Sequence, residues 1–382
     1  MAMTPKERAM AAFEHKPVDR IPVFHSGFSS WAGSVVLGRE AYVGGGIQQW
    51  REASALWEGE DAHEAFVERS RQDAYDLSRV LDQDLVRVQY WRMQERPAQK
   101  IDDLQFLYGD PEEDWHLMRF DPETELYQMV DQKPQSPTTL EDLEREVEAQ
   151  ERTLERPPPD SESYREEAEA MKALPDREVR GRGAGINIDY KRVIWLEAIA
   201  LRPDLVERLF EVQAEKGIRS IRPQAELGLR LLAGGSDFAS NKGPFYSPAF
   251  FGHAVLPRLQ KVTDAVHEAG CFLLYASDGN LWSVADDLFG VAKMDGFYEI
   301  DNRADMDLRR LRERFPDLTL MGGIHSHTLH QGTREEVVAE TRCAMETARE
   351  CGSILVGCSN QIVAGTPPDN IEAMVDTMEQ LR

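Results

Sequence analysis

The sequence predicts an α/β fold, a (β/α)₈ TIM-type barrel with an inserted segment after the second strand. Short apolar runs alternate with longer amphipathic stretches along most of the chain, and Gly-rich or polar turns separate them. This alternation is typical of a parallel sheet covered by helices. There are eight such apolar runs, the number that a closed barrel of this type requires. We therefore expect residues 1–382 to form a single barrel domain.

The eight expected strands are the apolar runs themselves. In chain order they are "IPVF" at 21–24, "DLVRVQYW" at 84–91, "REVRGRGAGIN" at 177–187, "LRLLAGGSDF" at 229–238, "CFLLYASDG" at 271–279, "GFYEID" at 296–301, "LTLMGGIH" at 318–325 and "SILVGCSN" at 353–360.

Helical patterns lie between these runs, and two of them carry end signals. Apolar residues recur every three or four positions over 247–270, and Gly270 stands where a C-terminal cap belongs. The segment 333–352 repeats this design, with Thr333 and Glu336 at the spacing of a capping box. Both segments are therefore predicted to be helices that cover the sheet.

A long polar interval, residues 92–176, interrupts the rhythm and is predicted to be an irregular, acidic insertion on the barrel. A hairpin is expected within "WHLMRFDPETELYQMV" at 115–130, and acidic helical segments are expected from 139 to 172. No repeat of 20–50 residues is visible, which argues against a solenoid.

The composition excludes several classes of partner. The chain has 44 basic and 68 acidic residues, a net charge of −24, which repels nucleic-acid phosphate and anionic membrane surfaces. No stretch approaches the roughly 18 apolar residues of a membrane span, and the N-terminus lacks the apolar core of a signal peptide. The four cysteines are too few and too irregularly spaced for a disulfide scaffold. We expect a cytoplasmic protein that binds neither nucleic acid nor membrane.

Polar residues end nearly every expected strand. In barrels of this type the chemistry lies at the C-terminal ends of the strands. These ends carry His25 and Ser26, Tyr90 and Trp91, Asn187 with Asp189 and Tyr190, Asp237, Ser277 with Asp278, Glu299 with Asp301, His325 with His327, and Cys358 with Asn360. A structural barrel would not need so many ionisable endings, so we expect an active site there.

Several of these residues also suit a structural role. Asp237 and Asp278 precede turns, where a carboxylate commonly caps the next helix. Glu299 favours a functional role, because an unpaired carboxylate at a buried strand end is costly. His325 lies in a histidine-rich loop that suits either metal binding or solvation. Cys358 is either a soft metal ligand or a small buried residue.

Motifs at both ends of the chain resemble those of the uroporphyrinogen decarboxylase superfamily. The opening "TPKERAMAAFEHKPVDRIPV" is similar to that superfamily's helix and first strand, and "GPFYSPAFFGHAVLPRLQKVTDAVHEAGCFLLYASDGN" is similar to its helix and fifth strand. The segments "MGGIHSHTLHQGTREEVVAET" and "ILVGCSNQIVAGTPPDN" complete the match. The resemblance implies a distorted (β/α)₈ barrel.

Departures from the family pattern bear on the reaction. The decarboxylases carry an arginine-rich stretch after the first strand, where this chain has "HSGFSSWAG", and a histidine where counting from Pro367 places Asn360. Porphyrin decarboxylation is therefore disfavoured. The zinc-dependent methyltransferases of the same superfamily carry a His-x-Cys pair where Ala276 and Asp278 stand here. The chain is most similar to the O-demethylase-like members, which it matches at residues 277–280.

This resemblance implies a methyltransferase that moves a methyl group from a methoxylated, aromatic small molecule to a corrinoid. The chain lacks a corrinoid-binding "DxHxxG" stretch, so the cobalamin would arrive on a partner protein. Homodimers are common in the superfamily, and one is expected here. The expected catalytic residues are Asp278, Glu299, Asn360 and His325; the expected metal ligands, for zinc, are Glu299, Cys358 and Asp278; the expected substrate contacts are His25, Trp31, Asn187, Tyr190, Asp237, Tyr246 and Tyr298.

Two rival functions stay open at the sequence level. One is a cofactor-free decarboxylase or lyase of a small acid, for which Lys242, Lys191 and Arg182 are the candidate cations. The other is a catalytically silent barrel that only binds a ligand, since Ala276 and Asn360 replace two expected ligands.

Overall fold

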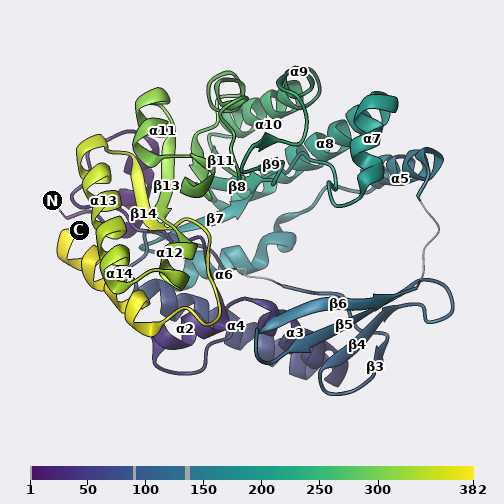
Figure 1. Cartoon of the computed structure of the whole chain (residues 1–382), viewed down its shortest axis with the longest axis horizontal. Coiled ribbons are helices and arrows are strands. Elements are labelled where there is room, and N and C mark those ends of the chain that lie inside the picture. Colours follow the sequence, from purple (N-terminus) through teal and green to yellow (C-terminus); the bar gives the residue numbers. More distant parts are fainter. Residues whose placement is uncertain (1, 89–91, 134–137) are drawn as a thin grey trace.

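A parallel sheet of seven strands forms most of the barrel wall (Figure 1). The computed structural model describes residues 2–88, 92–133 and 138–382. Around the sheet the strands are β14 (Ile354–Cys358), β13 (Thr319–Ile324), β12 (Gly296–Tyr298), β11 (Phe272–Ala276), β8 (Leu231–Gly235), β7 (Glu178–Arg182) and β2 (Leu85–Val86). All neighbours in this sheet pair in parallel. Tyr90 and Trp91, the expected end of the second strand, lie outside the described residues.

Residues 21–26 close the barrel as its eighth strand. The amide of Phe24 donates to the carbonyl of Val356 on one side, and the amide of Asp84 donates to the carbonyl of Val23 on the other. Closure depends on Gly357, because a Cβ at that position would lie 2.0 Å from the Phe24 carbonyl oxygen. The predicted TIM-type barrel is confirmed.

Fourteen α-helices are found in the described residues, and most of them surround the barrel (Figure 1). They are α1 (Pro5–Phe13), α2 (Ser30–Leu37), α3 (Gly46–Glu58), α4 (Glu60–Val80), α5 (Leu140–Arg152), α6 (Arg165–Ala173), α7 (Val193–Leu201), α8 (Pro203–Leu227), α9 (Pro248–Phe250), α10 (Leu256–Glu268), α11 (Leu308–Arg314), α12 (Ser326–Gln331), α13 (Arg334–Cys351) and α14 (Pro368–Leu381).

The end signals read from the sequence act as expected in both helices, α13 and α10, since Gly270 follows the C-cap of α10 with a left-handed φ of 68°. Thr333 and Glu336 form a reciprocal capping box at the start of α13, and Gly352 ends it. The predicted helix over 247–270 is divided, because a π-helical turn, residues 251–255, separates α9 from α10.

Two short strand pairs lie near the ends of barrel strands. The strand β1 (Gly27–Phe28) pairs in parallel with β15 (Gln361–Ile362), and β9 (Ala239–Ser240) pairs antiparallel with β10 (Gly243–Pro244). Both pairs extend the chain just beyond the C-terminal ends of barrel strands, so they help to shape the mouth.

Residues 92–133 form a separate antiparallel sheet of four strands in the part of the chain that the structure describes. Its strands are β3 (Gln99–Lys100), β4 (Gln105–Gly109), β5 (Trp115–Asp121) and β6 (Leu126–Gln132). The hairpin expected within 115–130 is formed by β5 and β6. Phe106, Tyr108, Phe120 and Tyr127 pack with Ala53 of α3 in a small core of their own.

The alternation of side chains along the strands divides the main core in two. A small cluster that includes Phe24, Leu85, Leu231, Leu274 and Leu355 fills the barrel interior. A larger cluster lies between the outside of the sheet and the covering helices. Residues two positions apart on one strand share a face. A polar residue two positions beyond a member of the small cluster therefore faces the barrel interior at the mouth.

A buried group of charges ties the chain ends to the first two strands. The Asp84 side chain is 0% exposed, and its carboxylate contacts Arg8 of α1 and the C-terminal residue Arg382. It also accepts a hydrogen bond from the amide of Val23 at 2.6 Å.

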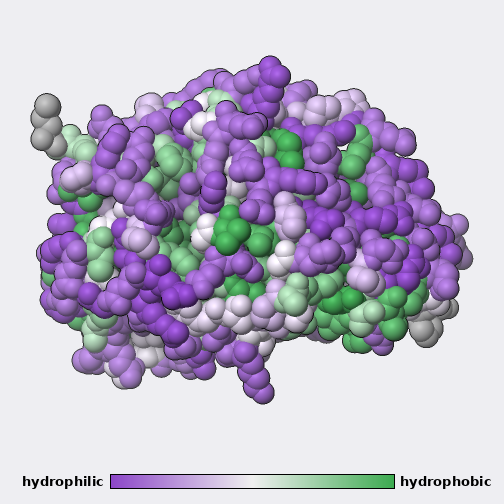
Figure 2. All heavy atoms as spheres, turned by 90° about the horizontal axis from the view of Figure 1, so that it is seen from above, coloured by the Kyte–Doolittle hydropathy of each residue, from purple (hydrophilic) through white to green (hydrophobic). Residues whose placement is uncertain are grey.

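Hydrophilic side chains cover most of the face shown in Figure 2, and hydrophobic ones gather in separate patches. Within the described residues no helix combines the length and the apolar character needed to cross a membrane.

Candidate active site

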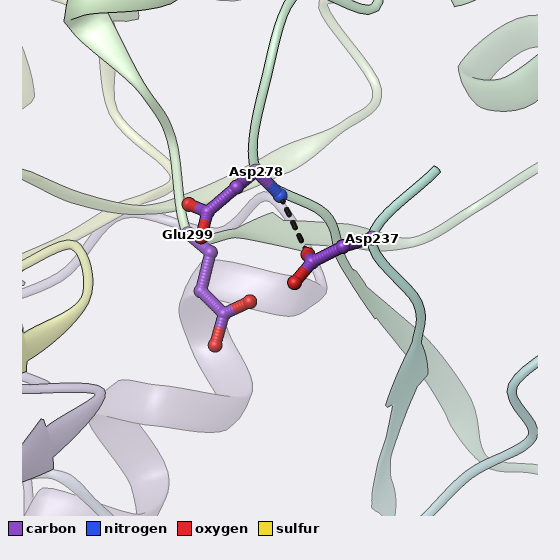
Figure 3. A group of neighbouring side chains, drawn as sticks. All are labelled: Asp237, Asp278 and Glu299. Atoms are coloured by element: carbon purple, nitrogen blue, oxygen red, sulfur yellow. Dashed lines mark hydrogen bonds between the residues drawn. The ribbon is translucent and has the colours of Figure 1, made fainter. Parts of the chain in front are cut away.

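Three carboxylates converge at the C-terminal ends of neighbouring barrel strands. Asp237 follows β8, Asp278 follows β11 and Glu299 follows β12, and one oxygen of each lies within 4.8 Å of the others. Figure 3 shows the three side chains meeting from these separate segments. We call Asp237, Asp278 and Glu299 the carboxylate cluster.

Strand alternation brings Asp278 to this place, and a loop brings Asp237. Asp278 lies two residues beyond Ala276, which belongs to the interior core, and so continues the interior face of β11. Asp237 lies two residues beyond Gly235, whose φ of 121° ends the regular alternation of β8, and the loop that follows brings its carboxylate to Asp278.

Glu299 reaches the cluster through an unusual backbone conformation. Its φ of 65° lies in the left-handed region, which is uncommon for a residue with a side chain. Regular alternation would place Glu299 on the same side as Phe297, which packs in the outer core. The left-handed backbone at Glu299 instead brings the Glu299 carboxylate to Asp278. Strain of this kind costs about 1 kcal/mol or more and is concentrated at functional sites.

Hydrogen bonds hold the Asp278 segment in place. The Asp278 amide donates to Oδ1 of Asp237 at 3.0 Å. The Asn360 side-chain amide donates to both carboxylate oxygens of Asp278, at 3.2 and 3.0 Å. Asn360 therefore orients the Asp278 carboxylate from across the barrel mouth.

Burial and mutual repulsion raise the pKa of two of the carboxyls. Burial, with the charge of Asp237 as the next cause, raises the pKa of Asp278 to about 6. Burial, followed by the charges of Asp278 and Asp237, raises the pKa of Glu299 to about 7, although Arg87 and Arg180 oppose the rise. The cluster can therefore hold a proton that an ordinary carboxyl would have lost.

His325 stands beside the cluster but is engaged on both ring nitrogens. Nε2 lies 3.2 Å from Oδ1 of Asp301, and Nδ1 accepts the amide of His327 at 3.0 Å. Because Nδ1 accepts, the proton of a neutral ring is on Nε2, which donates to Asp301. The hydrogen bond from His325 lowers the pKa of Asp301.

Two pockets adjoin the cluster on different sides. A pocket of about 760 Å³ is lined by Asp237 together with the expected substrate contacts Asn187 and Tyr190. A second pocket, of about 340 Å³, is lined by Asp278, Asn360 and His325 among others. The cluster therefore presents carboxyl oxygens to two separate spaces at the barrel mouth.

Other expected substrate contacts lie elsewhere. His25 is buried beside Phe28, its Nδ1 accepts the amide of Cys358, and burial lowers its pKa to about 4. Tyr246 is buried against Phe238 in the outer core. Trp31, 41% exposed, donates from its indole to a backbone carbonyl.

Tyr298 belongs to the interior core, and its hydroxyl donates to the carbonyl of Gly234. Tyr298 directly precedes Glu299 of the carboxylate cluster in the chain.

The structure brings Asp278 and Glu299 together, but with Asp237 rather than with Cys358. Cys358 lies two residues beyond Val356, and both pack in the outer core, on the helix side of β14. Its side chain is fully buried, and burial raises the pKa of the thiol to about 12. A thiol in this setting is a packing residue.

A model of the uroporphyrinogen decarboxylase (URO-D) family matches residues 191–381, half of the chain. The chain belongs to the uroporphyrinogen decarboxylase family. The match covers β8, β11, β12, β13 and β14, which carry every member of the carboxylate cluster.

Solved structures support the fold of this family member. A methyltransferase from Methanosarcina mazei is similar to the chain with a TM-score of 0.61 and 17% identity, over 99% of each chain. An IolI protein with a bound zinc atom matches with a TM-score of 0.24 and 9% identity over 56% of this chain and 79% of that one, too low a likeness for any argument. No curated protein sequence matches the chain.

Two arginines at the mouth of this uroporphyrinogen decarboxylase family barrel are missed by the sequence analysis. Arg87 and Arg180 both lower the pKa of Glu299 by their charge. Each is a charged residue inside an expected strand, flanked by apolar residues or glycine, and this placement is the signal that could have identified them. Arg182, a candidate from the sequence, instead pairs with Glu167 of α6 at 2.6 Å.

The carboxylate cluster does not fit the zinc site that the resemblance implies. Its donors are all carboxylate oxygens, and no histidine or cysteine of the described residues joins the group. Oxygen-only sets suit hard cations such as Mg²⁺ or Mn²⁺, whereas zinc favours nitrogen and sulfur ligands. We derive no catalytic step through zinc.

Glu299→Gln is expected to stabilise the fold at alkaline pH. The folded-state pKa of Glu299 is about 7, above the ordinary 4.5, so ionisation costs the folded state free energy. This cost is absent below the ordinary pKa, grows as the pH rises to about 7, and is full above it. At about pH 8 the variant should gain on the order of 1–3 kcal/mol in unfolding free energy.

Urea unfolding at about pH 8 and about pH 4 measures this difference, with Glu372→Gln on the exposed side of α14 as the matched control. An equal gain at both values, or a loss at the higher one, would contradict the burial of a charged Glu299.

Proposed function

We propose that the chain is a methyltransferase that takes the methyl group of a methoxylated, aromatic small molecule and passes it to a corrinoid on a partner protein. The observation that carries this proposal is the carboxylate cluster with raised pKa values at the barrel mouth. When the bond between oxygen and methyl breaks, the electron pair stays on the oxygen, and a carboxyl that is still protonated can neutralise it.

Each residue of the site has a part in this scheme. Glu299 holds the proton and delivers it to the leaving oxygen, and Asp278 keeps the pKa of Glu299 high. Asn360 orients Asp278. The larger pocket receives the arene beside Tyr190, whose ring stacks on Phe245 at 4.6 Å. A reduced corrinoid supplies the nucleophile that accepts the methyl group.

The comparisons support the class of reaction. The similar protein from Methanosarcina mazei is a methyltransferase, and the two chains cover each other almost completely. In our proposal the corrinoid protein docks over the C-terminal ends of the strands, the reaction takes place in the cytoplasm, and the chain acts as a homodimer.

A cofactor-free lyase of a small acid is the second candidate. Arg87 and Arg180 at the barrel mouth favour it, because stabilising charge on a carboxylate substrate requires a cation. The acid group that protonates a leaving oxygen would then protonate a carbanion.

One experiment separates the two reactions. The protein is incubated with a panel of methoxybenzenes and methoxybenzoates, with and without reduced cobalamin, and both phenol formation and carbon dioxide release are measured. We expect phenol that depends on both protein and cobalamin, without carbon dioxide. Carbon dioxide release that needs no cobalamin would instead establish the lyase, and an absence of phenol across the panel would overturn the proposal.

A further inference from the structure

The larger pocket at the barrel mouth extends from the carboxylate cluster to α5. Its volume is about 760 Å³, and its lining comes from α5, α7, α8 and the loop after β7, with the three helices packed against one another (Figure 1). Asp237 belongs both to this pocket and to the cluster. Pockets of about 300–1,000 Å³ hold drug-sized ligands, so a single methoxylated ring fills only part of this one.

Two polar side chains of the pocket have no hydrogen-bond partner among the residues that the structure describes. Trp195 is 4% exposed, and its indole N–H is one of these groups. The half-buried side-chain amide of Asn187 is the other. The backbone of Asn187 is fixed, because Gln213 accepts from its amide at 2.9 Å and donates to its carbonyl at 2.9 Å. A donor that is buried without a partner costs free energy, so these groups indicate a polar ligand.

The charges of the lining indicate what kind of polar ligand this is. Three carboxylates face one ammonium group in the pocket, and these residues are Glu146, Asp189, Asp237 and Lys191. This excess of negative charge repels an anionic ligand. Donors such as the indole N–H of Trp195, in turn, cannot bind a cation. A hydroxyl group both donates and accepts, so it can bond to carboxylates and to N–H groups alike. The lining therefore favours a neutral ligand with several hydroxyl groups.

We propose that this pocket binds a neutral, hydroxyl-rich ring, so that the methyl donor is a methoxylated arene that carries a sugar-like substituent. The arene lies beside Tyr190 and Asp237 with its methoxy group towards the carboxylate cluster, and the hydroxyl-rich ring lies between Asn187, Trp195 and α5. The inference rests on the proposed function and deepens it, because it names the class of substrate that the same pocket takes.

Calorimetry on the intact protein tests the site without turnover. The ligands are the 4-methoxyphenyl glycosides of glucose and galactose. Two probes without a sugar are compared with them: 4-methoxyphenol, which has the arene alone, and 4-methoxyphenyl cyclohexyl ether, which has a second ring but no hydroxyl groups. We expect at least one glycoside to bind about 10-fold or more tightly than either sugar-free probe, since a site built to bond hydroxyl groups discriminates against analogues that lack them.

Variants then assign the preference to residues. Asn187→Leu should weaken binding of that glycoside by about 10-fold and leave 4-methoxyphenol unchanged, and Asn187→Asp, which keeps an acceptor, should restore part of the loss. Trp195→Phe keeps an aromatic ring without the N–H and should also weaken the glycoside by about 10-fold. Gln128→Leu, which replaces an exposed amide on β6 outside the pocket, is the matched control and should bind like the wild type.

Equal affinity for the glycosides and the sugar-free probes, or unchanged glycoside binding in both Asn187→Leu and Trp195→Phe, would overturn the inference. Cobalamin-dependent demethylation of 4-methoxyphenol together with such equal affinity would overturn it while upholding the methyltransferase proposal. Glycoside binding that depends on Asn187 and Trp195 but leads to no demethylated glycoside would uphold the hydroxyl-binding pocket and count against the methyltransferase proposal.

Discussion

Glu299→Gln is expected to lower the rate of methyl transfer by about 10²- to 10⁴-fold, the range that loss of a positioned general acid typically produces. Glutamine keeps the size of the side chain but cannot release a proton to the leaving oxygen. Since the wild-type acid has a pKa of about 7, its rate should fall as the pH rises above that value. The variant should lack this fall.

Single-turnover rates measured from about pH 5 to 9 check both expectations, with Glu372→Gln as the control. A variant that keeps the wild-type rate, or that keeps the alkaline fall in rate, would remove Glu299 from the role of proton donor. Because the same substitution is expected to stabilise the fold at alkaline pH, a lost activity could not be ascribed to unfolding.

Asp84→Ala is expected to lower the unfolding free energy by about 3–5 kcal/mol, because it removes the buried carboxylate that Arg8 and Arg382 share and leaves them only the more exposed carboxylates of Asp19 and Asp82. Asp84 is 0% exposed and Arg8 is 1% exposed, and Asp84 also binds Arg382 at 2.6 Å. The substitution further leaves the amide of Val23 without its acceptor in the strand that closes the barrel. The loss should therefore affect closure of the whole barrel.

The midpoint and slope of urea unfolding measure this change. Asp103→Ala serves as the matched control, because Asp103 is 93% exposed and its carboxylate forms an ion pair with nearby Lys100. A loss below about 1 kcal/mol, the size typical of a surface ion pair, would show that the buried charges do not hold the chain ends.

The strands were predictable because a parallel strand covered on both faces must be apolar along its whole length. The segment "ILVGC" illustrates this, since all five of its residues are buried in β14. Turn residues and capping signals then gave the helix ends, as at Thr333. These signals depend on neighbouring residues in the sequence, and both are found in the structure.

The candidate site was only partly predictable, because it depends on which face of a strand a side chain occupies. His25 and Cys358 end their strands as expected, but both lie on the side that faces the helices. Glu299 is the opposite case: it would face the helices by alternation, but its left-handed backbone directs its carboxylate into the site. The face that each strand-end side chain occupies cannot be predicted from the sequence without knowing which residues fill the barrel interior.

The grouping of Asp237 with Asp278 and Glu299 also required the structure. The three residues are far apart in the sequence, and only the order and register of β8, β11 and β12 bring their carboxylates together. Arg180 was overlooked for a related reason: the sequence places it in a strand but does not show that its guanidinium faces Tyr298 across the barrel.

The central claim is that the carboxylate cluster retains a proton near neutral pH. A ¹³C NMR titration of the Asp and Glu side-chain carboxyls tests it directly, with Glu299→Gln and Asp278→Asn assigning the resonances. We predict apparent pKa values of about 7 and about 6 that belong to the interacting pair and shift together when either residue is replaced. If every carboxyl has titrated by about pH 5, near the ordinary values, the cluster holds no such proton and the proposed mechanism is wrong.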